Sequence, residues 1–211
     1  PTYMLNCGLG SVIGVAFAGF LLIRNSWAYE NLSVLSEAVG IGIPRFAPIA
    51  AAAVCMVLST VAITAPSVSL EGRTIWLSQS LPVTPWQVLR AKLAVHLWVG
   101  GIPALLCGVA VAAALRLPFP TAVMTVILLL LFTLLQACFG LFVNLLHPNL
   151  TWVSEMTPIK QSLGVLFSLL GGWGYAALLG VGGYFLTVPV PAWIALLALN
   201  LLTALLSLLL L

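Results

Sequence analysis

Long apolar runs separated by short polar segments are the main pattern of this chain. A helix needs about 20 apolar residues to cross the hydrocarbon core of a bilayer, and six segments qualify. The runs lack the alternation of a membrane barrel, so we predict helices. The chain is therefore expected to be an all-α, polytopic membrane protein with one domain over residues 1–211. Its six predicted spans are residues 5–23, 46–65, 91–115, 119–146, 163–187 and 192–211.

A different periodicity lies between the first two predicted spans. Within residues 26–42, Ala28, Leu32 and Leu35 follow helical spacing, and Glu30 and Glu37 lie on the opposite face. This pattern predicts an amphipathic helix in the plane of the membrane surface. The Gly-Ile-Gly-Ile-Pro stretch from residue 40 onwards is expected to end it. Between the last two spans, the sequence TVPVP is compatible with a tight turn or a re-entrant hairpin.

Residues 66–92, called the island below, interrupt the apolar pattern most strongly. They hold four of the eleven Asp, Glu, Lys and Arg residues of the chain. Residues 69–80 can form a short surface helix that ends before Pro82. Thr84, Pro85 and Gln87 then form a predicted capping box, so the third spanning helix should begin at Pro85. A plain solvated loop is the alternative interpretation.

Composition excludes several classes of protein. Hydrophobic residues make up 63% of the chain and charged residues 5%, and the mean hydropathy is +1.23. A soluble domain carries about 25% charged residues, so most of this chain must lie in lipid. The net charge of +3 forms no basic patch, which excludes nucleic acid as a partner. The chain starts at Pro1 and ends within an apolar run, so we expect it to be part of a longer protein.

The distribution of basic residues favours one orientation. Placing the island in the cytoplasm puts four basic residues inside and leaves three outside, in accord with the positive-inside rule. Both ends of the chain would then be cytoplasmic. The inside set is Arg73, Arg90, Lys92 and Lys160, and the outside set is Arg24, Arg45 and Arg116.

Motifs for nucleotide chemistry and catalysis are missing from this sequence. A Walker A loop needs a lysine directly after a glycine, and neither Lys92 nor Lys160 follows a glycine. There is no GxSxG, HExxH or paired aspartate for a membrane-embedded enzyme. His147 has no second ligand at metal-binding spacing. We therefore expect no catalytic residue, metal or cofactor in this chain.

Polar residues within the predicted spans are few. Gln136 and Asn144 are eight residues apart, close to two helical turns, so they lie near one face of the fourth span. Asn200 lies in the sixth span. These three residues could line a translocation path, although hydrogen bonding between helices is the favoured interpretation.

Three segments carry a resemblance to a known family. They are PTYMLNCGLG at the start, SLEGRTIWLSQSLPVTPWQVLRAKL in the island, and NLLHPNLTWVSEMTPIKQSLGVL after the fourth span. Together and in this order they resemble the C-terminal membrane half of bacterial type-2 ABC exporter permeases. The chain departs from the family pattern at Leu70, where arginine is common, at Arg73, where lysine is usual, and at His147-Pro148, which lacks a preceding acidic residue.

The resemblance implies a type V ABC exporter fold in the bacterial cytoplasmic membrane. It implies a transmembrane subunit that pairs with a second permease half and with a separate ATPase subunit, on which ATP and Mg²⁺ would bind. The island would be the coupling helix that docks on the ATPase. The residues implied in coupling are Glu71, Arg73, Trp76, Leu77, Pro82, Pro85 and Trp86, and a second cytoplasmic loop would contribute His147, Asn149, Trp152, Glu155 and Lys160.

Two other function classes remain as alternatives. A non-transporting membrane scaffold or assembly subunit would keep the same spans and loops. A membrane-embedded enzyme is the less favoured class, because the sequence lacks the motifs that such an enzyme needs.

Overall fold

The helices of the structure follow the apolar runs of the sequence. The computed structural model describes residues 7–40, 42–72, 74, 76, 80, 82–150, 152 and 162–211, and these contain helices and turns but no strand. In chain order the elements are α2 (Leu9–Ile23), α3 (Asn25–Val39), η1 (Ile43–Phe46), α4 (Ala47–Leu58), η2 (Ser69–Glu71), α6 (Pro85–Ala114), α7 (Phe119–Leu146), α9 (Leu163–Leu186) and α10 (Ala192–Leu210).

Four of these helices are long and apolar enough to cross a bilayer. They are α6 with 30 residues, α7 with 28, α9 with 24 and α10 with 19. At 1.5 Å per residue, even the shortest reaches about 28 Å, close to the thickness of the hydrocarbon core. The chain is therefore a membrane-embedded, multi-pass helical protein. Helices are confirmed at the third to sixth predicted spans, and the total of six spans stays a prediction.

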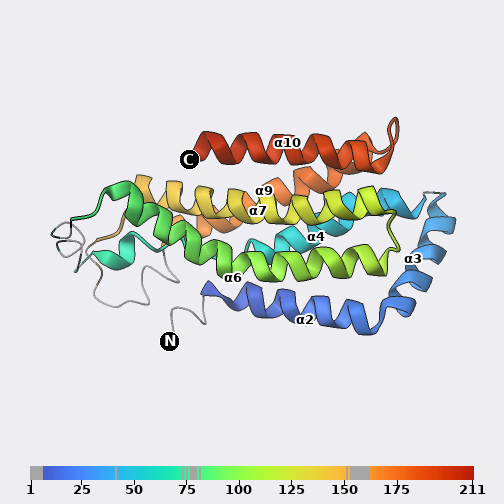
Figure 1. Ribbon diagram of the computed structural model, residues 1–211, viewed down its shortest axis with the longest axis horizontal. Helices are drawn as coiled ribbons and strands as arrows, with labels where there is room; N and C mark the ends of the chain where they lie inside the picture. Colours follow the sequence, from blue (N-terminus) through green and yellow to red (C-terminus); the bar gives the residue numbers. More distant parts are fainter. Residues whose placement is uncertain are drawn as a thin grey trace.

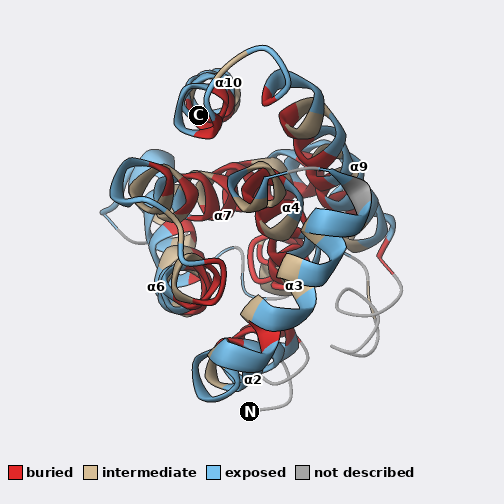
Figure 2. Cartoon of the chain, turned by 90° about the vertical axis from the view of Figure 1, so that its right-hand side faces the viewer, coloured by how far each residue is buried: buried red, intermediate tan, exposed pale blue. Residues whose placement is uncertain are grey.

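α7 lies near the centre of the bundle (Figure 1 and Figure 2), against α6 and α10, while α4 packs on α9 and α2 packs on α6. Leu128, Leu129 and Phe132 of α7 are almost completely buried, as are Leu179 of α9 and Leu196 of α10. Since lipid tails are as apolar as these side chains, close packing rather than exclusion of water holds the helices together.

The predicted amphipathic helix is confirmed as α3. It meets α2 at an angle of 83° and lies across the end of the bundle opposite the island (Figure 1). Gly40 ends the helix with a positive φ of 69°, a conformation that costs glycine little. The Arg116 guanidinium lies 4.1 Å from the centre of the Tyr29 ring and so links α3 to the turn between α6 and α7.

The helix predicted over residues 46–65 is wrong in its second half, because α4 ends at Leu58. The Ser59 hydroxyl donates to the Met56 carbonyl at 2.7 Å, and the Thr60 hydroxyl donates to the Val57 carbonyl at 2.7 Å. Hydroxyl groups that bond to nearby carbonyls compete with helical hydrogen bonds. Residues 59–68 then continue as turns and irregular backbone.

The segment predicted as a helix over residues 69–80 begins with a 3₁₀ turn, η2, and of its later residues that the structure describes, Trp76 and Ser80 are helical. Ser69 itself is completely buried, which does not fit a helix lying on the membrane surface from its first residue. Trp76 is 65% exposed. The predicted residues Arg73 and Leu77 lie outside the described residues, as do Glu155 and Lys160 of the second loop.

The stretch TVPVP forms a turn rather than a re-entrant hairpin. α9 continues to Leu186, and α10 begins at Ala192. The Thr187 hydroxyl donates to the Tyr184 carbonyl at 2.7 Å, which helps to close the end of α9. The simple turn was one of the two forms that the sequence allows.

Candidate functional site

Ser69 joins the island to the loop that follows α7. The Asn144 side-chain nitrogen donates to the Ser69 hydroxyl at 2.8 Å, and the Asn149 backbone nitrogen donates to the same oxygen at 3.0 Å. The Trp152 ring nitrogen donates to the Ser69 carbonyl at 2.6 Å. Two polar segments that are far apart in sequence therefore meet at one buried serine.

Asn144 holds the backbone of the island as well as the serine side chain. Its side-chain oxygen accepts from the backbone nitrogens of Val68 at 2.8 Å and Ser69 at 3.1 Å. Asn144 is completely buried near the end of α7. An amide side chain suits this position because it donates and accepts at once. Asn144, one of the candidates for a translocation path, thus fixes the island to α7.

Gly72 allows the two loops to touch through their backbones. A Cβ atom at this position would lie 2.6 Å from the Leu150 carbonyl oxygen and 3.0 Å from the Leu150 Cα. Both atoms belong to the main chain and cannot turn aside, so any larger residue would push the loops apart. Glycine is required here for the close approach of the two loops. Its φ of −42° is not unusual.

An ion pair connects the island to the start of α6. The Lys92 Nζ lies 2.8 Å from the Glu71 Oε1, and it donates to the Ser67 carbonyl at 2.8 Å. Glu71, which the resemblance places toward an ATPase, is therefore paired with Lys92 within the chain. The two bonds fix the first part of the island to α6.

The start of α6 agrees with the sequence prediction. The Gln87 side chain accepts from the Thr84 backbone nitrogen at 2.8 Å, and the Gln87 backbone nitrogen donates to the Thr84 hydroxyl at 3.4 Å. Pro85 is the first residue of the helix. The Arg90 guanidinium lies 5.0 Å from the centre of the Trp86 ring. This capping box gives α6 a defined beginning, with Pro82 exposed just before it.

A second polar cluster surrounds the irregular segment after α4, deeper in the bundle. The Gln136 side-chain nitrogen of α7 donates to the Ser168 carbonyl at 3.0 Å and to the Ser59 carbonyl at 3.4 Å. The Thr64 hydroxyl lies 3.2 Å from the Nδ1 of His96. Irregular backbone at membrane depth must be buried in protein and hydrogen bonded. Here Gln136 bonds the Ser59 carbonyl, and the backbone nitrogens of Val61 and Ala62 donate to the carbonyls of Leu58 and Cys7.

The three candidates for a translocation path do not meet at one place. From α7, Gln136 contacts Ser59 in the segment before the island, whereas Asn144 contacts Ser69 in the island itself. The Asn200 side-chain nitrogen donates to the Met124 carbonyl at 3.0 Å, at the contact of α10 with α7. All three serve as hydrogen-bonding groups between elements, as the favoured interpretation expects.

The remaining predicted loop residue, His147, is exposed just after α7. Among the described residues, no group of three or more His, Cys, Asp and Glu side chains is placed to hold a metal ion. The contacts that the structure shows between the island, the loop after α7 and α6 are hydrogen bonds and an ion pair.

Sequence reasoning missed the residues that carry most of these contacts. Ser67, Ser69 and Gly72 fall within the island but have no periodic or charge signal of their own. Ser168 lies within an apolar span. The segment SLEGR, on which the resemblance partly rests, was the signal that could have directed attention to Ser69 and Gly72.

Comparison of the chain with protein-family models, with curated proteins and with solved structures finds no match in any of the three.

Proposed function

We propose that this chain is the transmembrane subunit of an ATP-driven ABC exporter in a bacterial cytoplasmic membrane. The observation that carries the proposal is the junction at Ser69. It brings together the island and the loop after α7, which hold two of the three segments that resemble exporter permeases. A separate ATPase would dock on the exposed side of this junction, where Trp76 is 65% exposed.

The contacts of the junction suit the transfer of movement from a docked partner to the bundle. Glu71 is bound to Lys92 on α6, and Ser69 is bound to Asn144 on α7. A displacement of the island would therefore act on two long helices through buried or half-buried polar contacts. The capping box at Thr84 keeps the beginning of α6 from fraying.

The irregular segment between α4 and the island extends this connection. Residues 59–68 are bound to α7 and α9 through Gln136, which contacts Ser59 and Ser168. Interrupted helices near the middle of a membrane form substrate and ion sites in transporters. Together with a second permease half, the bundle would form the path for the transported molecule.

Purification from native membranes tests this proposal. The full-length protein, tagged and solubilised in mild detergent, is expected to carry along a subunit with a Walker A motif, and the complex in proteoliposomes should hydrolyse ATP and move cargo. A stable assembly that hydrolyses no ATP would contradict the proposal and favour the scaffold class. Hydrolysis without any cargo movement would also contradict an exporter.

A further inference from the structure

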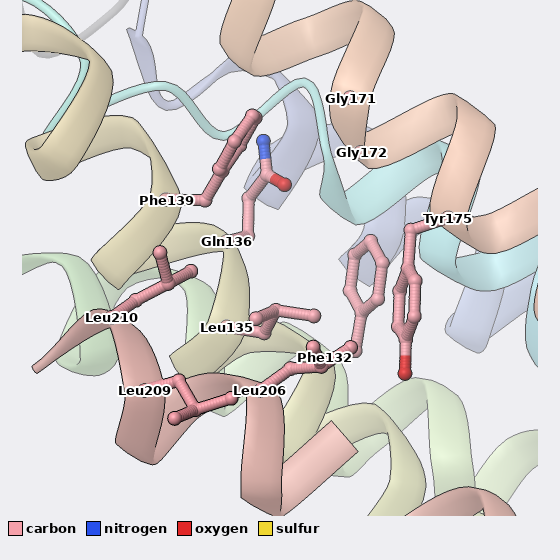
Figure 3. A pocket seen from close by; sticks show the side chains of 10 residues that line it. All are labelled: Phe132, Leu135, Gln136, Phe139, Gly171, Gly172, Tyr175, Leu206, Leu209 and Leu210. Atoms are coloured by element: carbon pink, nitrogen blue, oxygen red, sulfur yellow. The ribbon is translucent and has the colours of Figure 1, made fainter. Parts of the chain in front are cut away.

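An apolar pocket of about 300 Å³ opens between α7, α9 and α10. Figure 3 shows Phe132, Leu135, Gln136 and Phe139 of α7 on one wall, Gly171, Gly172 and Tyr175 of α9 on another, and three leucines of α10 closing it. α10 packs mainly on α7 and touches α9 at few positions, which leaves this space. The leucines are Leu206, Leu209 and Leu210.

Two polar groups beside the pocket, the side-chain nitrogen of Gln136 and the hydroxyl of Tyr175, are already bound within the protein. The Gln136 side-chain nitrogen donates to Ser168 and Ser59, and the Tyr175 hydroxyl is hydrogen bonded to Thr203 at 2.8 Å. A sugar, ion or peptide would leave its own polar groups without partners there, which is costly in an apolar site. The pocket therefore suits a hydrocarbon chain.

The rim of the pocket is continuous with the lipid-facing surface. Leu209 is 73% exposed on a helix that is long enough to span the membrane, so we expect it to face acyl chains. Leu210 also lines a second cavity together with Trp86 and Leu89, which lie at the beginning of α6. The pocket is therefore in the half of the bundle nearer the island. Its occupant would come from the leaflet on the island side.

We propose that this pocket binds one acyl chain of a phospholipid from the leaflet on the island side. The volume is about twice that of an engineered apolar cavity that takes up benzene, so it is large enough for part of a chain. The bound chain would contact Gln136, the residue that holds the break after α4. The proposal does not depend on the exporter function, since it requires only that the long helices lie in a bilayer.

Photolabelling tests the proposal on the full-length protein in lipid nanodiscs. The probe is a phosphatidylcholine with a diazirine in the middle of one acyl chain, and labelled residues are identified by mass spectrometry. We expect label on Leu135, which is only 8% exposed, because a chain must enter the pocket to reach it. Label spread evenly over exposed leucines such as Leu205 and Leu208, with none on Leu135, would overturn the proposal.

A pair of variants supplies a matched comparison. Leu206→Trp should fill the pocket and lower the label on Leu135 about fourfold or more, because each methylene excluded from an apolar site weakens binding by about that factor. Leu205→Trp, on an exposed position outside the pocket, should leave the label unchanged. Equal labelling in both variants would contradict the proposal. A disulfide between two copies of a Leu209→Cys variant, together with exclusion of the probe, would also contradict the proposal, because a second copy of the chain would then cover the pocket.

Discussion

The Ser69 hydroxyl accepts a hydrogen bond from the Asn144 side chain at 2.8 Å, across 75 positions of sequence. This bond ties a buried serine of the island to the last turns of α7. The same asparagine accepts from two backbone nitrogens of the island. Asn144 thus holds the island to α7 with both ends of its amide.

Replacement of that amide should destabilise the protein strongly. Asn144→Leu leaves the backbone N–H groups of Val68 and Ser69 without their acceptor, and each unsatisfied buried group costs about 1–3 kcal/mol. We expect the free energy of unfolding, measured by titration with a denaturing detergent in mixed micelles, to fall by about 2–4 kcal/mol. Asn31→Leu, on the exposed part of α3, should change it little. Equal losses in the two variants would contradict the role given to Asn144.

The ion pair between Glu71 and Lys92 should contribute a modest coupling energy. In a double-mutant cycle with Glu71→Gln and Lys92→Met, we expect about 0.2–1 kcal/mol, because both groups are partly exposed. Lys92→Met should cost more than Glu71→Gln, by about 1 kcal/mol, since it also removes the bond to the Ser67 carbonyl. Additive single effects, with no coupling, would show that the pair is not formed in solution.

The close approach at Gly72 predicts that the smallest possible side chain is harmful there. Gly72→Ala should lower the midpoint of thermal unfolding, at a cost of about 1–3 kcal/mol, because the Leu150 backbone cannot move aside alone. Gly174→Ala is the control, since nothing lies within 4 Å of a Cβ atom there. That change should be neutral or stabilising, as alanine favours helices over glycine. A neutral Gly72→Ala variant would mean that the loops do not touch in this way.

Loss of the capping box should loosen only the beginning of α6. Thr84→Ala removes the hydroxyl that accepts from the Gln87 backbone nitrogen and should cost about 1 kcal/mol. Hydrogen exchange measured by mass spectrometry should then be faster over residues 85–90 and unchanged in α7. Thr84→Ser keeps the hydroxyl and should preserve slow exchange. If Thr84→Ala leaves exchange over these residues unaltered, the cap does not stabilise the helix.

Local patterns predicted those parts of the fold that depend on neighbours in sequence. The capping box at Thr84 and the glycine stop after α3 involve residues within a few positions of one another, and both are confirmed. The long apolar runs from residue 91 onwards also form the expected helices. The end of α4 was missed because residues 61–65 are nearly as apolar as the helix before them. Hydropathy does not distinguish a buried helix from buried irregular backbone.

The candidate site was predictable as a region but not as a set of contacts. The island stood out by its charges, yet the bonds that organise it come from Asn144 and Ser69, which no local pattern pairs. The same holds for Gln136, whose partners lie on two other segments. Such pairings depend on how the bundle folds in three dimensions. A single sequence records them only as isolated polar residues in apolar surroundings.

The most direct test of the proposed function compares two exposed tryptophans. Trp76 is 65% exposed in the island, and Trp98 is 72% exposed along α6. With the tagged full-length protein in native membranes, Trp76→Ala should reduce the amount of co-purifying ATPase about tenfold or more, since a tryptophan at the centre of an interface contributes about 2 kcal/mol. Trp98→Ala should retain the ATPase fully. Equal retention by both variants, at equal expression, would contradict docking on the island.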